Sequence, residues 1–429
     1  MKLFDIIEVF IAGDWGEETY SKETPCAVTC VRGADIIPIS EYDFSAIPVR
    51  YISQQAYAKK CLQVGDIIIE KSGGSPTQST GRVSLVSQEL LDHAGAVICS
   101  NFCTAFRVKK GWNPLYVYYY LQFIYNLGAF FNFEGKTSGI KNLQLDAAFA
   151  AIPTEDISES IQNNIVAILQ GLERKIAINR QINQNLEAMA KQLYDYWFVQ
   201  FDFPNEEGKP YKSSGGEMVW NEKLRKDIPE YWEVKSLSNW LEIKSGFPFK
   251  SETYKPIGRY KIITIKNVQD GELVTSGCDY VNEIPSRAKD YISLQIGDRL
   301  ISLTGNCGRL CVVCEENLLL NQRVGLLCCD AIYLEYFYNF LNSSTMRTVI
   351  DNLANGAAQA NLSPVELCKT DYFIPPIDIL LSYNRKANAI RKVIVQNNQE
   401  ISPLTKQRDE LLPLLMNGQV SVNSDLSLG

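Results

Sequence analysis

The 429-residue sequence contains an internal repeat, and a repeat constrains a fold more than any other feature of a sequence. The pentapeptide Leu62–Asp66, Leu-Gln-Val-Gly-Asp, returns as Leu-Gln-Ile-Gly-Asp at Leu294–Asp298. After each copy come an apolar, strand-like run and a polar loop that ends in Gly-Arg, at Arg82 and at Arg309. Because these landmarks recur in the same order, we predict two homologous halves; two copies are too few for a solenoid.

Each half then ends in a pattern typical of a coiled-coil helix. Apolar and small residues alternate by four and by three over residues 165–197 in the first half and over residues 383–415 in the second. Two such helices in one chain most simply pack against each other. The seam residues that we expect to pair them are Leu172, Ile176, Asn179, Leu186, Leu193, Trp197, Ile390, Ile394, Asn397, Ile401, Leu404, Leu411 and Leu415.

Three residues add detail to the helix prediction. Asn179 and Asn397 occupy equivalent seam positions, where a buried asparagine can fix the register of two helices at some cost in stability. The alternative is that either asparagine is simply exposed near a frayed helix end. Pro403 lies inside the second helix and is expected to kink it, because its ring removes one backbone hydrogen bond.

The repeat and the helices divide the chain into six segments. We predict an α+β fold in which two homologous, mixed α/β domains are separated by two long antiparallel helices that form a coiled coil, with a pseudo-two-fold internal repeat. A turn-rich connector is expected to run over the surface. The predicted bounds are 1–153 for the first domain, 154–200 for the first helix, 201–230 for the connector, 231–376 for the second domain, 377–417 for the second helix and 418–429 for a flexible tail.

Composition excludes several classes of protein. With 46% hydrophobic and 21% charged residues, the chain is neither disordered nor collagen-like. Its longest apolar stretch, Leu115–Phe133, is interrupted by polar residues, and the N-terminus meets Asp5 at once, so we expect neither a membrane span nor a secretory signal. We therefore expect a cytoplasmic protein whose 12 cysteines are reduced. A net charge of -7 leaves room for a local basic face only.

No constellation of residues predicts catalysis by this chain. The single histidine, His93, is expected to be a surface loop residue rather than a general base. The tetrapeptide Asn113–Tyr116 (Asn-Pro-Leu-Tyr) is similar to the Asn-Pro-Pro-Tyr loop of amino-methyltransferases, but the second proline is missing and Pro114 fits a helix start better. The sequence has no phosphate-binding Gly-x4-Gly-Lys loop.

The cysteines of the second half permit two interpretations. Cys307, Cys311 and Cys314 invite a zinc site. Zinc-binding Cys-x2-Cys pairs usually lie on turns, however, whereas Cys311 and Cys314 bracket two valines in a strand-like run, where residues three apart point to opposite faces. We favour buried core thiols and predict no metal site.

The remaining class of function is binding. The repeated polar loops are the best candidates for a binding site. Each loop has a corresponding segment downstream, which contains Asn142 in the first half and Asn361 in the second. They offer the amide, hydroxyl and guanidinium groups that proteins use for base edges and phosphates. An ordinary polar loop is the alternative. The foremost candidates are Gln78, Arg82, Lys141, Asn306, Arg309 and Gln359, and the full set adds Lys71, Ser75, Thr77, Ser79, Thr80, Lys136, Asn142, Thr304, Gln322, Arg323 and Asn361.

Several segments resemble the specificity subunits of type I restriction-modification systems. Asn185–Pro204, which reads NLEAMAKQLYDYWFVQFDFP, resembles the central conserved region of that family. Ile228–Val234 (IPEYWEV) resembles the start of its second target-recognition domain, and Gln407–Gly418 (QRDELLPLLMNG) resembles its C-terminal conserved region. Together with the recurrent pattern from Gly65 to Arg82, the resemblance extends over nearly the whole chain.

The resemblance implies a function that the residues alone do not. In that family each recognition domain reads one half of a bipartite DNA sequence, and the paired helices space the half-sites and dock two methyltransferase subunits. Those subunits bind S-adenosylmethionine and methylate adenines, and motor-nuclease subunits join them for restriction. We therefore expect a non-catalytic, cofactor-free chain of the bacterial or archaeal cytoplasm that binds double-stranded DNA and no membrane.

The resemblance leaves one alternative function open, and at one place the sequence departs from the family pattern. Because the loops diverge between the halves, the two half-sites are expected to be unrelated. The alternative is a silent or degenerate specificity cassette that acts only as a protein-interaction scaffold. The first domain lacks the Pro-x-x-Trp start that precedes the second domain at Pro229–Trp232, so it either lacks this support or draws on the C-terminal tail for it.

Overall fold

The computed structural model describes residues 1–75, 78–137, 140–354 and 360–420. The chain forms two compact units. Unit 1 comprises Met1–Ala177 together with the chain from Pro403 onwards, and unit 2 comprises Ile178–Ser402. Each long helix is thus divided between the units, and the predicted division into recognition domains, helices and connector stays a prediction. In the part of the chain that is described, no helix is both long and apolar enough to cross a membrane.

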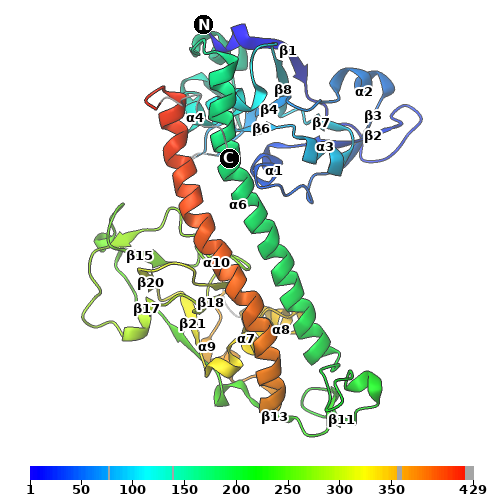
Figure 1. The fold of residues 1–429 in the computed structure, drawn as a ribbon, viewed down its shortest axis with the longest axis vertical. Coiled ribbons are helices and arrows are strands. Elements are labelled where there is room, and N and C mark those ends of the chain that lie inside the picture. Colours follow the sequence, from blue (N-terminus) through cyan, green and yellow to red (C-terminus); the bar gives the residue numbers. More distant parts are fainter. Residues whose placement is uncertain (76–77, 138–139, 355–359, 421–429) are drawn as a thin grey trace. The chain divides into compact units, whose positions relative to one another are not determined.

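In its described residues, unit 1 contains three sheets, and most of their strands are labelled in Figure 1. The first is antiparallel, in the order β1 (Ile7–Ala12), β8 (Cys103–Val108), β4 (Ile67–Glu70) and β6 (Val83–Leu85). In the second, β2 (Cys26–Val31) pairs antiparallel with β3 (Val49–Ile52) and parallel with β7 (Val97–Cys99). The third orders β5 (Ser72–Gly73), β10 (Ile140–Leu143) and β9 (Glu134–Thr137). The helices are η1 (Leu3–Ile6), η2 (Gly33–Asp35), α1 (Ile36–Ser40), α2 (Gln54–Lys60), α3 (Gln88–Ala94), α4 (Pro114–Asn126), η3 (Phe131–Phe133) and α5 (Leu145–Ala151).

Unit 2 repeats the first two of these sheets. Its antiparallel sheet has the order β14 (Glu242–Ser245), β21 (Val324–Cys328), β18 (Arg299–Ser302) and β19 (Leu310–Val312). Its mixed sheet has the order β16 (Tyr280–Val281), β15 (Tyr260–Ile263), β20 (Leu318–Leu320) and β17 (Ser293–Leu294), with β15 and β20 parallel. Further elements are β11 (Met218–Asn221), β12 (Lys226–Pro229), β13 (Glu233–Ser236), β22 (Asp371–Ile374), η5 (Lys212–Ser214), η6 (Leu237–Asn239), η7 (Ser251–Thr253), η8 (Asp290–Ile292), α7 (Ala331–Leu341), α8 (Ser344–Ala354) and α9 (Pro364–Cys368).

The repeated pentapeptide forms the same turn in both units. The Asp66 carboxylate accepts the backbone N–H of Gln63 at 2.8 Å, and the Asp298 carboxylate accepts that of Gln295 at 2.8 Å. The glycine between them has a φ of 90° in the first copy and 96° in the second, a conformation that favours glycine. Each turn leads into the third strand of its antiparallel sheet, β4 or β18, and the predicted internal repeat is confirmed.

The cores explain why aromatic residues gather on one helix of each unit. Phe106, Tyr119 and Phe149 are buried in unit 1 between the antiparallel sheet, α4 and α5. In unit 2, α7 buries an unbroken run from Tyr336 to Phe340 against β22. The predicted helix start is confirmed, because the Asn113 side chain accepts the N–H of Leu115 at 2.9 Å and Pro114 is the first residue of α4.

The two long helices are α6 (Glu159–Tyr194), extended by a π-helical turn η4 (Asp195–Val199), and α10 (Ile377–Met416). Within unit 2 they pair directly through polar contacts. Asn179 donates to Glu400 at 2.8 Å, and Asn397 donates to Asn183 at 2.9 Å. Because positions later in α6 meet positions earlier in α10, the helices are antiparallel, as the sequence predicts.

The seam follows the predicted heptads. Every predicted seam residue is buried or half-buried, including both asparagines, so the exposed alternative for Asn179 and Asn397 is wrong. Helix α10 continues through Pro403 without a break in its assigned span, and the kink stays a prediction. In unit 1 the last turns of α10 bury Leu412, Leu415 and Met416 against Leu3 and Ile6, so this end of α10 supports the first domain.

Two sequence-based expectations are wrong. The connector does not simply run over the surface, because Phe201, Phe203 and Tyr211 are buried in the core of unit 2. Phe203 stacks on Tyr211, with ring centroids 4.7 Å apart, and the apolar area gained outweighs the turn-forming composition around it. His93 is exposed but lies in helix α3 rather than in a loop, since the Ser87 side chain caps the start of that helix.

Candidate nucleic-acid interface

The structure brings each polar loop together with its predicted downstream segment. In unit 1 the N–H of Leu143 donates to the carbonyl of Lys71 at 2.7 Å, and Asn142 pairs with Ser72 across β10 and β5. In unit 2 the N–H of Leu362 donates to the carbonyl of Leu303 at 2.8 Å, and the next residues, Thr304 and Asn361, form a β-bridge. Residues far apart in sequence thus form one polar platform in each unit.

In unit 1 the platform is cross-linked by buried and half-buried charges. Lys141 lies 3.2 Å from the Glu134 carboxylate and donates to the Gln78 carbonyl at 3.1 Å. Glu134 also accepts the N–H of Thr80 at 2.6 Å and its hydroxyl at 3.1 Å. Burial alone would raise the pKa of Glu134, but the hydrogen bonds from Thr80 and Lys141 outweigh it and lower that pKa. The ionised carboxylate therefore holds the loop in place.

Arg82 forms an ion pair with a buried carboxylate of the same chain. Its guanidinium donates two hydrogen bonds to the carboxylate of Glu70, at 2.9 and 2.6 Å, and Glu70 is only 2% exposed. The bond to Glu70 raises the pKa of Arg82 further above its ordinary value. Gly81 is required beside it, because its φ is 101° and a Cβ there would lie 2.7 Å from the Phe130 ring. Base reading by Arg82 stays a prediction, and the observed role is structural.

In unit 2 the corresponding arginine has different partners. Ser302 takes the place of Glu70, because its backbone makes the same two hydrogen bonds, to Gly308 and Arg309. The serine carries no charge to hold the guanidinium, so Arg309 donates instead to the side chain of Gln269 at 2.5 Å. Arg347 pairs with the neighbouring Asp270 at 2.8 Å. The two platforms therefore share a backbone but differ in chemistry.

The other candidates differ in exposure. Asn306, Gln322 and Arg323 are exposed, whereas Thr80 is buried and contacts only the chain itself. The half-buried candidates are Lys71, Ser75, Gln78, Ser79, Arg82, Lys141, Asn142, Thr304 and Arg309, whereas Asn361 is exposed. Thr77, Gln359 and the side chain of Lys136 lie outside the described residues. Exposed polar groups are thus more prominent in unit 2 than in the described part of the first loop.

Comparison with known proteins gives the family. The family model of the type I restriction modification DNA specificity domain matches residues 38–188. The chain is 26% identical, over 61% of its length, to the type I restriction enzyme MjaIX specificity subunit of Methanocaldococcus jannaschii, and 25% identical, over 60% of its length, to the HindI specificity subunit of Haemophilus influenzae. The family model and both relatives indicate a type I restriction-modification specificity subunit. The matched segment spans 59% of the first relative and 67% of the second.

A solved structure supports the fold of this chain. The S subunit of a type I restriction-modification system from M. genitalium aligns over 97% of this chain and 95% of its own, with a TM-score of 0.56. Its sequence identity is 15%, so the likeness concerns the fold alone. The predicted fold class, two mixed domains with long antiparallel helices, is confirmed.

Sequence reasoning missed a cleft in unit 2. This cleft, of about 480 Å³, is lined by the aromatic residues Phe249 and Tyr254, the exposed Lys266, and the predicted candidates Gln322 and Arg323. Aromatic faces beside cations are common in nucleic-acid sites. The lining comes from four separate segments, so no local sequence pattern could have revealed the cleft.

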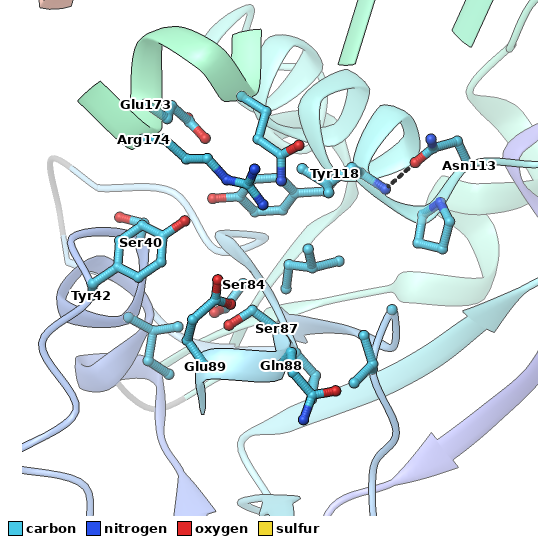
Figure 2. A pocket seen from close by; sticks show the side chains of 18 residues that line it. Ser40, Tyr42, Ser84, Ser87, Gln88, Glu89, Asn113, Tyr118, Glu173 and Arg174 are labelled. Atoms are coloured by element: carbon cyan, nitrogen blue, oxygen red, sulfur yellow. Dashed lines mark hydrogen bonds between the residues drawn. The ribbon is translucent and has the colours of Figure 1, made fainter. Parts of the chain in front are cut away.

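A second cavity, of about 380 Å³, lies in unit 1, where α6 meets the loops around α1 and α3 (Figure 2). Tyr42, Tyr118 and Arg174 line it together with Glu173, and none of the predicted DNA-contacting residues does. The Tyr119 hydroxyl donates to Glu173 at 2.6 Å. Burial raises the pKa of Glu173, against the effects of Tyr119 and Arg408.

Of the three cysteines considered for zinc, Cys307 and Cys311 are buried and Cys314 is half-buried. Cys311 lies in β19 and is fully buried, and burial raises its pKa. Cys314 accepts a weak hydrogen bond from Asn398 at 3.6 Å. Among the described residues no three Cys, His, Asp or Glu side chains cluster as metal ligands would.

Proposed function

We propose that this chain is the non-catalytic subunit that selects the DNA sequence for a type I restriction-modification complex. In this proposal residues 1–153 and 231–376 form two target-recognition domains, and each reads one half of a bipartite site in double-stranded DNA. The observation that carries it is the duplicated polar platform, in which Ser72 meets Asn142 and Thr304 meets Asn361. A duplicated platform on one backbone suits a protein that reads two half-sites.

The differences between the platforms support an asymmetric site. Glu70 neutralises Arg82 in unit 1, whereas Ser302 leaves Arg309 to pair with Gln269 in unit 2. Because base edges are read by specific donors and acceptors, two chemically different platforms are expected to prefer different sequences. We therefore propose two unrelated half-sites.

The long helices are proposed to dock two methyltransferase subunits, which bind S-adenosylmethionine and methylate adenines, while motor-nuclease subunits add restriction. On α6, Ile178, Ile182 and Met189 are exposed at spacings of four and seven residues and therefore share one helix face. An exposed apolar stripe of this kind suits a helical protein partner. Partner subunits would also supply positive surface that a chain of net charge -7 lacks.

Specific binding in the presence of the methyltransferase tests this proposal. The chain would be co-purified with methyltransferase subunits encoded beside its gene, and mixed with a library of random duplexes from which bound DNA is selected and sequenced. We expect one enriched motif with two defined halves and an undefined gap. Capture of the methyltransferase without any enriched motif would instead support the silent or degenerate cassette.

A further inference from the structure

Two short turns occupy the same position in the two units. The turn between β7 and β8 is closed by a hydrogen bond from the N–H of Cys103 to the carbonyl of Ser100, at 2.9 Å. The turn between β20 and β21 is closed in the same way, from Val324 to Asn321, at 2.9 Å. The strands that follow, β8 and β21, both lie between the first and third strands of their antiparallel sheets.

The tips of these turns are Phe102 and Arg323. The carbonyl of Phe102 accepts the N–H of Lys71 at 2.8 Å, and the carbonyl of Arg323 accepts the N–H of Leu303 at 3.0 Å. Lys71 and Leu303 are themselves equivalent, because their carbonyls accept the downstream segments of the two platforms. Phe102 and Arg323 are therefore structural counterparts, and each is hydrogen-bonded to the start of a polar platform.

Both turns are held rigidly from the other side. A Cβ on Gly13, just after β1, would lie 2.0 Å from the carbonyl oxygen of Ser100. A Cβ on Gly246, just after β14, would lie 2.2 Å from the carbonyl oxygen of Leu320. Neither backbone can tolerate a side chain there without moving, so each turn is packed closely against a glycine.

The side chains at these rigid tips are nevertheless turned to solvent. Phe102 is 53% exposed. Arg323 is also exposed, and among the described residues no hydrogen bond or ion pair of its guanidinium is found. It lies at the rim of the cleft that also holds Lys266 and Tyr254. A binding residue requires a backbone that is held in place and a side chain that is exposed to a ligand, and both turns have this arrangement.

We propose that Phe102 and Arg323 are equivalent base-contacting residues, one for each half-site: Phe102 packs on the 5-methyl group of a thymine, and Arg323 donates two hydrogen bonds to a guanine. This proposal rests on the proposed function. In the major groove the thymine methyl is the apolar group that a phenyl ring can contact, and guanine O6 and N7 accept the fork of an arginine. The two half-sites would thus differ at one structurally equivalent position.

Base analogues in the target DNA test each contact separately. Binding would be measured for the complex of this chain with its methyltransferase subunits, on the motif selected by the wild-type complex. Replacing one thymine by deoxyuridine, which lacks the methyl group, should weaken wild-type binding about fourfold. Replacing one guanine by 7-deazaguanine should weaken it roughly fivefold or more. We expect Phe102→Ala to be insensitive to the first analogue and Arg323→Ala to the second.

Matched variants separate base contacts from other roles. Phe4→Ala removes a similarly exposed phenylalanine of unit 1 and should keep the sensitivity to deoxyuridine. Arg323→Lys keeps the charge but loses the planar fork, so it should lose discrimination at the guanine nearly as Arg323→Ala does. Unchanged thermal unfolding of each variant would show that the exposed side chains do not act through folding.

Several outcomes would overturn the proposal. If every deoxyuridine affects the wild type and Phe102→Ala equally, Phe102 does not contact a thymine methyl. If Arg323→Ala weakens binding to all sequences evenly and flattens the salt dependence, while Arg323→Lys binds normally, then Arg323 contacts phosphate. A wild-type complex that selects no motif at all would overturn the proposed function itself, and this inference with it.

Discussion

A single buried carboxylate decides what a loop arginine does in this protein. The sequence places Arg82 and Arg309 in the same Gly-Arg context, and both are reasonable candidates for contacts with DNA. The structure gives them different partners, because Glu70 stands opposite the first and Ser302 opposite the second. That difference depends on the register of neighbouring strands, which residue spacing along one chain does not reveal.

Arg82→Ala is expected to destabilise unit 1 rather than alter its sequence preference. The substitution leaves the Glu70 carboxylate buried and unpaired, which should cost about 3–5 kcal/mol in the free energy of unfolding. Chemical denaturation of the wild type and the variant measures this loss. The control is Glu70→Gln combined with Arg82→Ala, which removes the buried charge and should recover part of the stability. A stable Arg82→Ala variant whose methylation motif changes at one base pair would show that Arg82 reads a base after all.

Heptad spacing predicts which positions of the helices are buried, but it does not predict the polar contacts among them. Glu187 of α6 pairs with Arg391 of α10, and Arg391 and Arg299 both contact Glu335 of α7. These charges come from four elements, α6, α7, α10 and β18, so no single sequence pattern contains the network. The aromatic residues of the connector were missed for a similar reason, since their neighbour Trp232 lies beyond a turn-rich segment.

Glu173 makes the attachment of α6 to α4 in unit 1 sensitive to pH. Because its pKa is raised, the folded chain holds the proton more tightly than the unfolded chain does. Its contribution to stability is therefore fully present below the ordinary carboxyl pKa and is lost as pH rises through the raised pKa.

The Glu173→Gln side chain stays neutral at every pH and can still accept the hydrogen bond from Tyr119, so this variant should be more stable than the wild type at about pH 7. Thermal unfolding at several pH values should show this difference shrinking towards about pH 4. A wild type that is the more stable one at pH 7 would mean that Arg408 and Tyr119 outweigh burial.

At the scale of the whole molecule, the repeat predicted the architecture well. It anticipated two mixed units with the same turn before β4 and β18, and the heptad spacing anticipated the two long helices. The counterpart positions Phe102 and Arg323 could not be found this way, because Ser-Asn-Phe-Cys and Asn-Gln-Arg-Val have no identical residue at any equivalent position. Only the hydrogen bonds of the strands around them reveal the correspondence.

The length of the paired helices is expected to set the gap between the half-sites. Removing residues 175–181 from α6 together with 399–405 from α10 deletes one heptad from each helix and keeps their pairing. At about 1.5 Å per residue and about 3.4 Å per base pair, the gap should shorten by roughly three base pairs. Sequencing of methylated sites in cells that carry the variant measures the gap. Deletion from α6 alone should abolish methylation, because it shifts the register of the seam; an unchanged gap in the double deletion would contradict the spacer role.

The most direct test of the central claim is a base-resolution map of adenine methylation in the host, with this gene intact and with it deleted. We predict that the deletion removes one gapped motif whose two halves are unrelated in sequence. That result would establish the specificity role and give the target site at the same time. Loss of no motif, or of a palindromic one, would contradict the account of two different platforms that read two different half-sites.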